Sequence, residues 1–159
     1  MFEIYHGSNF DNDLFFTCSI IEYIGRLTKN KRAYIVNMLG TKGIDFIYEF
    51  ADVLHSENID AVADELIRDY KIVNGTFDNV KECEAEEYRV PSFWDVGKIY
   101  MRLIMPLCDN EFNSDKLEIL IEVYNSYIAE CIDDYVIGFY FSSPECIYES
   151  YKVGEMLTV

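Results

Sequence analysis

Residues 90–109 constrain the fold more than any other stretch of the sequence. Pro91 and Ser92 mark a helix start, because proline is tolerated in the first turn and a serine side chain can accept a hydrogen bond from a free amide there. The apolar residues of the stretch recur at steps of three and four, and this spacing predicts an amphipathic helix. Because Pro106 has no amide hydrogen, we expect the helix to stop or kink near Met105. The apolar positions are Phe93, Val96, Ile99, Tyr100, Leu103, Ile104 and Leu107.

Similar apolar spacing lies on both sides of this segment, so we expect it to be the central helix of a helical fold. Further helices are predicted at residues 14–27, 32–39, 43–54, 59–70, 115–133 and 145–152. The Asn74-Gly75 pair is typical of a tight hairpin, and residues 135–141 form a β-branched and aromatic run that suits a strand. The sequence therefore predicts a mainly all-α fold. We expect a compact single-domain bundle of about six helices over residues 1–159, with at most a minor β element.

The second constraint is charge, because 29 acidic residues against 13 basic ones give a formal net charge of −16 at pH 7. A negative field of this size repels nucleic acid and anionic membrane surfaces, so we expect neither as a direct partner. It attracts basic proteins, among which toxins and nucleic-acid-binding proteins are candidates. The same charge keeps a protein soluble, and this second interpretation stays open beside the first.

The tightest cluster of carboxylates lies within residues 72–90, a segment with little helical periodicity. We interpret it as an acidic surface loop between two helical halves. Its candidate contact residues are Glu82, Glu84, Glu86 and Glu87, which would attract a basic partner, and Tyr88, which would add an aromatic anchor. A solvated loop without a partner explains the same cluster equally well.

Two smaller charged groups are assigned to the ends of helices. Lys29, Lys31 and Arg32 form the densest basic patch, where one helix ends and the next begins, and cations are favoured at a helix C-terminus. The pair Asp133-Asp134 is expected to end a solvated helix face.

The chemistry-bearing residues favour a non-enzymatic role. The five cysteines are odd in number and show no C-x-x-C spacing, and with only two histidines in the chain we predict no metal site. We also expect no cofactor, because the sequence has neither a Walker loop nor a G-x-G-x-x-G motif. Cysteines without a pairing pattern indicate a reducing cytoplasm. We expect neither secretion nor membrane insertion, because the sequence shows no signal-peptide pattern and no apolar run of about eighteen residues.

Two short motifs resemble ADP-ribosyltransferases. Tyr5-His6-Gly7-Ser8 is similar to the first strand of that fold, which ends in His-Gly-Ser or His-Gly-Thr, and Gly138-Phe139-Tyr140-Phe141-Ser142 is similar to its second strand. The resemblance implies that His6, Ser8 and Tyr140 bind NAD. Some 130 residues that favour helices separate the motifs, about nineteen residues follow Tyr140, and Glu155 is a poor match for the family's catalytic glutamate.

A second resemblance covers most of residues 12–150. The segments LFFTCSIIEYIGRLTKN, YIVNMLG, ADVLHSENIDAVADELI and VPSFWDVGKIY resemble a family of small, acidic, helical bacterial proteins without an assigned activity. Members of that family are encoded near ADP-ribosyltransferase-like proteins, in the manner of toxin–antitoxin modules. The resemblance implies a helical fold throughout and assigns Gly138–Phe141 to this family.

Together these features predict a non-catalytic, cytoplasmic, acidic regulator that binds a basic protein, similar in action to an inhibitor or an antitoxin. Electrostatic steering would bring the partner in, and aromatic anchors would then be buried. One alternative is a nucleic-acid mimic that inhibits a nuclease or another DNA- or RNA-binding protein. Another is an NAD-dependent ADP-ribosyltransferase-like enzyme that uses His6, Ser8 and Tyr140.

Overall fold

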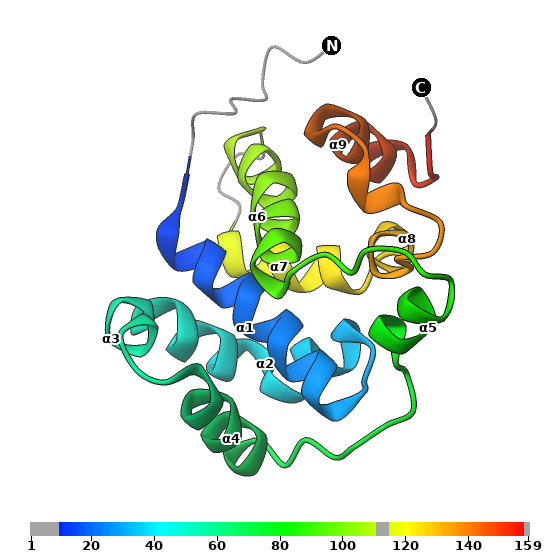
Figure 1. Ribbon diagram of the computed structural model, residues 1–159. Coiled ribbons are helices and arrows are strands. Elements are labelled where there is room, and N and C mark those ends of the chain that lie inside the picture. Colours follow the sequence, from blue (N-terminus) through cyan, green and yellow to red (C-terminus); the bar gives the residue numbers. More distant parts are fainter. Residues whose placement is uncertain (1–9, 111–114, 158–159) are drawn as a thin grey trace.

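The computed structural model describes residues 10–110 and 115–157, and in this part of the chain the fold is all-α (Figure 1). The predicted fold class is therefore confirmed. The number of helices, predicted as about six, is wrong, because the described residues form nine α-helices and one 3-10 helix. In chain order these are α1 (Asn12–Thr28), α2 (Arg32–Glu49), α3 (Ala51–His55), α4 (Ile59–Asp69), α5 (Asn79–Ala85), α6 (Phe93–Asn110), α7 (Lys116–Tyr124), α8 (Tyr127–Asp133), η1 (Phe139–Phe141) and α9 (Pro144–Val153).

Two helices that were not predicted begin at capping residues. Ser126 divides the predicted helix 115–133, because its side chain accepts a hydrogen bond from the Ala129 amide at 3.3 Å and so begins α8. Asp78 begins α5 in the same way, accepting from the Lys81 amide at 3.0 Å. Gly40, where we predicted a helix end, takes φ 65° and ψ −177° and interrupts the helical geometry inside α2.

The predicted central helix is α6, which packs mainly against α1. The two helices approach closely at Gly97, where an added Cβ atom would lie 2.1 Å from Ser19 Oγ and 2.9 Å from Ser19 Cα. Glycine is therefore needed at this crossing. The stop or kink predicted near Met105 does not end the helix, which continues past the buried Pro106 to Asn110.

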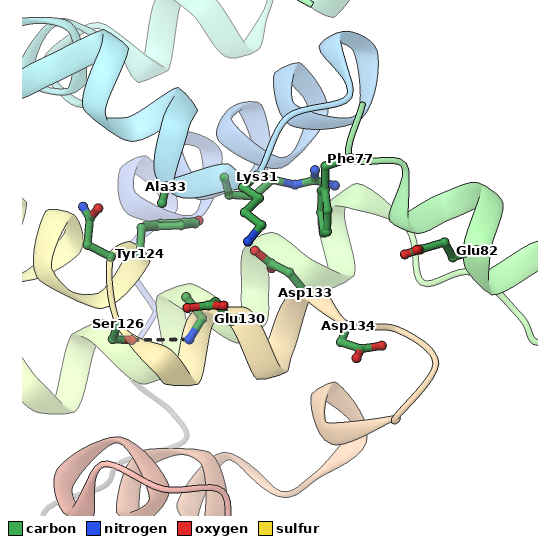
Figure 2. Close-up of a pocket in the computed structure, with 12 residues that line it drawn as sticks. Lys31, Ala33, Phe77, Glu82, Tyr124, Ser126, Glu130, Asp133 and Asp134 are labelled. Carbon is green, nitrogen blue, oxygen red and sulfur yellow. Dashed lines mark hydrogen bonds between the residues drawn. The ribbon is translucent and has the colours of Figure 1, made fainter. Parts of the chain in front are cut away.

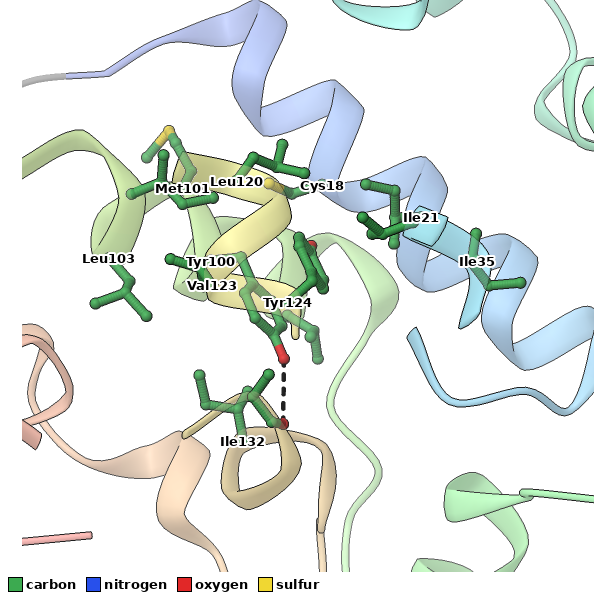
Figure 3. Close-up of a cluster of buried hydrophobic side chains, with 14 of the residues drawn as sticks. Cys18, Ile21, Ile35, Tyr100, Met101, Leu103, Leu120, Val123, Tyr124 and Ile132 are labelled. Atoms are coloured by element: carbon green, nitrogen blue, oxygen red, sulfur yellow. Dashed lines mark hydrogen bonds between the residues drawn. The ribbon is translucent and has the colours of Figure 1, made fainter. Parts of the chain in front are cut away.

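The apolar core lies between α1, α2, α6, α7 and α8 (Figure 3). The rings of Tyr100 and Tyr124 stack at its centre with their centroids 4.1 Å apart. Both side chains are fully buried, as are Cys18, Ile21 and Ile35 around them. The core thus joins helices from the first and last thirds of the chain.

Neither predicted β element forms a strand within the described residues. The Gly75 amide donates to the Thr28 carbonyl at 2.8 Å and the Phe77 amide to the Lys29 carbonyl at 2.9 Å, so this backbone pairs with the α1–α2 connection instead of folding into a hairpin. Residues 135–141 form turns and η1, which follows a left-handed Gly138. The first pairing matters for the site, because it places Phe77 and α5 beside the start of α2.

Candidate functional site

A buried ion pair between α1 and α2 is the first part of the site. Arg32 donates from Nε to Glu22 Oε1 and from Nη2 to Glu22 Oε2, each at 2.9 Å. Glu22 is 1 % exposed and Arg32 is fully buried. Gly25 gives the arginine room, because a Cβ atom there would lie 2.4 Å from Arg32 Cδ. Arg26 adds a second cation, donating from Nε to Glu22 Oε2 at 2.7 Å.

The hydrogen bonds of Arg32 extend this pair to α5 and α8. Its Nη1 donates to the Asn30 carbonyl at 2.7 Å and its Nη2 to Asn79 Oδ1 at 3.0 Å. Asn79, the first residue of α5, then donates from Nδ2 to the Asp133 carbonyl at 3.0 Å. At the end of α8, Asp133 Oδ1 accepts from the Tyr100 hydroxyl at 2.8 Å. One chain of polar contacts therefore connects α2, α5, α6 and α8.

Arg26 closes the other side of the network. Its Nη2 donates to the Pro91 carbonyl at 2.7 Å and lies 3.1 Å from the Tyr135 hydroxyl. The Tyr135 hydroxyl in turn donates to Glu22. These contacts hold the segments before α6 and after α8 against α1. We call Glu22, Arg26, Arg32, Asn79, Tyr100, Asp133 and Tyr135 together the buried polar network.

The two buried carboxyl groups of the network have opposite electrostatic environments. Burial acts to raise the pKa of Glu22, but the charge and hydrogen bonds of Arg32 and the charge of Arg26 outweigh it, and the pKa falls to about 2. Burial, with the nearby charge of Glu22 as a second cause, raises the pKa of Asp133 to about 7. Glu22 is therefore ionised at neutral pH, whereas its environment makes Asp133 much easier to protonate than an ordinary aspartate.

The network reaches the surface at a pocket of about 290 Å³, which we call the α5–α8 pocket (Figure 2). In Figure 2, Asp133 points from α8 toward Lys31, and Glu82 and Glu130 lie on opposite sides of it. Aromatic area comes from Phe77 and Tyr124. The full lining is Lys31, Arg32, Ala33, Phe77, Glu82, Tyr124, Asn125, Ser126, Ala129, Glu130, Asp133 and Asp134.

This lining is suited to binding a cation. Four of its residues carry carboxyl groups and two carry cations, and one of those cations, Arg32, is already paired with Glu22. The hydroxyl of Ser126 is occupied, because it donates to the Val123 carbonyl at 2.6 Å and accepts from the Ala129 amide. The pocket lining contains no histidine to activate it as a nucleophile.

The structure brings one predicted contact residue into the pocket and leaves the others on the adjoining surface. Glu82 lines the pocket from α5. Glu84, Glu86 and Glu87 are exposed on α5 and directly after it, and Tyr88 is 53 % exposed. The segment 72–90, predicted as a loop, thus contains a short helix that presents its carboxylates outward.

Of the predicted NAD-binding residues, Tyr140 alone lies in the described part of the chain. His6 and Ser8 lie outside the described residues. Tyr140 is buried, its ring lies edge-on to Tyr135 at 5.7 Å, and its hydroxyl is 3.5 Å from the Arg89 carbonyl.

The buried polar network was not predicted from the sequence, and one surface assignment is wrong. Asp133 was assigned to a solvated helix face, yet it is buried. Arg32 lies at the predicted junction between two helices, and it is buried there. One available signal was Glu22, which follows Phe15 at seven residues and Cys18 at four and so lies on the apolar side of the predicted helix. A charge at that position indicates a buried partner.

Comparison with known proteins gives no significant match to a family, to a curated protein or to a solved structure. Within residues 10–110 and 115–157, no cluster of three or more histidine, cysteine or acidic side chains could hold a metal ion. In the same part of the chain, every helix is too short or too polar to span a membrane.

Proposed function

We propose that this protein is a non-catalytic regulator that binds a basic protein partner, in the manner of an inhibitor or an antitoxin. One observation carries the proposal. Carboxylates that are far apart in the sequence meet at one place, with Glu82 of α5 and with Glu130 and Asp134 of α8 around the same pocket. Glu84, Glu86 and Glu87 extend this acidic surface along the chain.

The physical mechanism has two stages. The net charge of −16 and the concentration of carboxylates around α5 raise the rate of encounter with a basic surface, an effect that salt screens within about 10 Å at 0.1 M. Contact residues then supply short-range affinity. Tyr88 is an exposed aromatic residue next to the glutamates, and Phe77 offers an aromatic wall inside the pocket.

A pull-down from cell extract tests the proposal. The tagged protein is compared with a variant that carries Glu→Gln at Glu82, Glu84, Glu86 and Glu87. A matched control carries Asp45→Asn and Glu→Gln at Glu49, Glu118 and Glu122, four exposed carboxylates on α2 and α7. Both variants lose the same charge, so they differ only in where it is lost. Each sample is repeated after nuclease treatment and at rising salt.

We expect wild type and the α2/α7 control to retain a basic protein at low salt, whereas the α5 variant releases it. Retention should be insensitive to nuclease and should fall with salt. Equal loss in both variants would reject a specific acidic surface, and an absence of any retained protein would reject the proposal altogether. Duplex DNA that displaces the chain from its partner would instead favour the nucleic-acid mimic.

A further inference from the structure

We infer that the α5–α8 pocket receives the guanidinium of one arginine from the basic partner, and that Asp133 is the buried carboxylate that pairs with it. This inference rests on the proposed function and names the contact that would fix the partner in register. It requires a carboxylate with a free oxygen, an aromatic wall and an excess of negative charge, and the pocket offers all three.

Asp133 supplies the free oxygen. Its side chain is buried, with 6 % of the residue exposed, and it forms part of the pocket lining. Oδ1 accepts the hydrogen bond from Tyr100, while no donor to Oδ2 occurs among the described residues. An acceptor in the pocket lining is left to solvent unless a donor reaches it, and a charged donor binds it more strongly than a neutral one does. A guanidinium is such a donor, and its planar fork matches a carboxylate.

The aromatic wall is already in use for a guanidinium. The guanidinium carbon of Arg32 lies 5.8 Å from the ring centroid of Phe77, on the network side. Phe77 also lines the pocket, together with Tyr124. Aromatic rings favour cations at this range, and arginine more than lysine, because its flat group stacks on a ring.

The charge balance selects a cation over an anion. The pocket lining has four carboxyl groups and two cations, Lys31 and Arg32. The charge of Arg32 is already balanced by its ion pair with Glu22, which is not part of the lining. The exposed Lys31 is therefore the one cation of the lining that lacks a buried ion-pair partner among the described residues, and it competes with an incoming arginine for the same carboxylates. A volume of about 290 Å³ is at the lower limit of ligand pockets, which suits a single side chain better than a nucleotide.

Arginine binding should be linked to a proton. The charged and titratable groups around Asp133 come from every element packed against it: Glu22 and Arg26 on α1, Lys31 and Arg32 on α2, Glu82 on α5, Tyr100 on α6, Tyr124 on α7, Glu130 and Asp134 at α8, and Tyr135. With the pKa of Asp133 at about 7, the ionised fraction rises about tenfold between pH 6 and pH 8. If only the ionised form pairs with arginine, affinity rises by the same factor, about tenfold.

The test is an NMR titration of the full chain with arginine amide, with citrulline amide as the uncharged isostere. We expect arginine amide to shift backbone resonances around Phe77, Glu130 and Asp133, with about tenfold tighter binding at pH 8 than at pH 6. Citrulline amide should cause no such shift. A Glu118→Gln variant, exposed on α7, serves as the control and should titrate like wild type.

Two variants separate the inference from a general charge effect. Asp133→Asn keeps an acceptor for Tyr100 but should weaken arginine amide binding at pH 8 at least tenfold and remove its pH dependence. Lys31 is exposed at the rim of the pocket. Lys31→Gln should tighten binding of arginine amide because it removes the competing cation, whereas replacing a lysine with only a structural role would not tighten it. Wild-type-like binding in Asp133→Asn would overturn the inference. Weaker binding in Lys31→Gln, or equal shifts with citrulline amide, would overturn it as well.

Failure here can be told apart from failure of the proposed function. A partner that is captured through the four glutamates, while arginine amide leaves the pocket resonances unshifted, rejects the arginine contact alone. Conversely, if arginine amide binds specifically but no protein is captured, the pocket remains an arginine site and the proposed regulatory function is rejected.

Discussion

Replacing Glu22 by glutamine should destabilise the protein by about 3 kcal/mol at pH 7. The change removes the carboxylate that forms ion pairs with both Arg32 and Arg26, and it leaves the fully buried guanidinium of Arg32 without an ion-pair partner among the described residues. The fall in the pKa of Glu22 from 4.5 to about 2 corresponds to about 3 kcal/mol, at about 1.4 kcal/mol for each tenfold change. Measured losses when one partner of a buried pair is removed are similar, about 3–5 kcal/mol.

The assay is urea unfolding followed by the helical circular dichroism signal. Glu118→Gln is the matched control, because it makes the same chemical change at an exposed position of α7 and should alter the free energy of unfolding by no more than about 0.5 kcal/mol. A folded-state pKa below the unfolded value stabilises the protein above that unfolded value. The difference between wild type and Glu22→Gln should therefore be complete above pH 4.5 and shrink as the pH falls toward about 2.

Two results would refute this reasoning. A loss below about 1 kcal/mol at pH 7 would mean that solvent or other groups compensate Arg32 in the variant. A difference that stays constant as the pH falls from 4.5 to about 2 would mean that the ionisation of Glu22 does not contribute the stability.

Two further predictions concern packing and thiol chemistry. Gly97→Ala should cost about 1–3 kcal/mol, because its methyl group would lie 2.1 Å from Ser19 Oγ and force α1 and α6 apart; the same urea assay measures it, and wild-type stability would contradict it. Cys18 is fully buried, and burial raises its pKa to about 12, so iodoacetamide at pH 8 should modify it only after unfolding. Peptide mass spectrometry checks this, and native labelling at the unfolded rate would oppose it.

The helices could be predicted where apolar periodicity and capping residues agree. Asn58 and Ser143 begin α4 and α9 as the sequence indicates, with Pro144 at the first helical position and a left-handed Gly154 after the last. The prediction of one helix over 115–133 is wrong because α7 and α8 both pack on the core, so their apolar spacing continues across the break. Ser126, a residue that favours helix starts, was the signal of that break.

The site could be predicted only in part. Local composition indicates an acidic segment, and the exposure of Glu84, Glu86 and Glu87 agrees with it. The pocket depends on pairs that lie far apart, such as Arg32 with Asn79 and Tyr135 with Glu22, and the sequence shows that a residue is charged but not which residue meets it. Arg32 is buried because it pairs with Glu22, ten residues earlier. The turn between α1 and α2 brings the two side chains together, and the conformation of that turn could not be read from the sequence.

The buried polar network and the acidic surface are physically coupled. Within α5, Cys83 is buried in the core and Val80 packs against it, so apolar contact holds this short helix at two positions. Asn79 is also buried. This first residue of the helix is held by two hydrogen bonds, from Arg32 and to the Asp133 carbonyl. The same two residues line the pocket. These hydrogen bonds help to fix the position of Glu82 relative to Glu130 and Asp134. Arg32, which donates one of them, is paired in turn with Glu22 of α1. A negatively charged residue buried in α1 thus contributes, through Arg32 and Asn79, to the position of the exposed negative charge of α5.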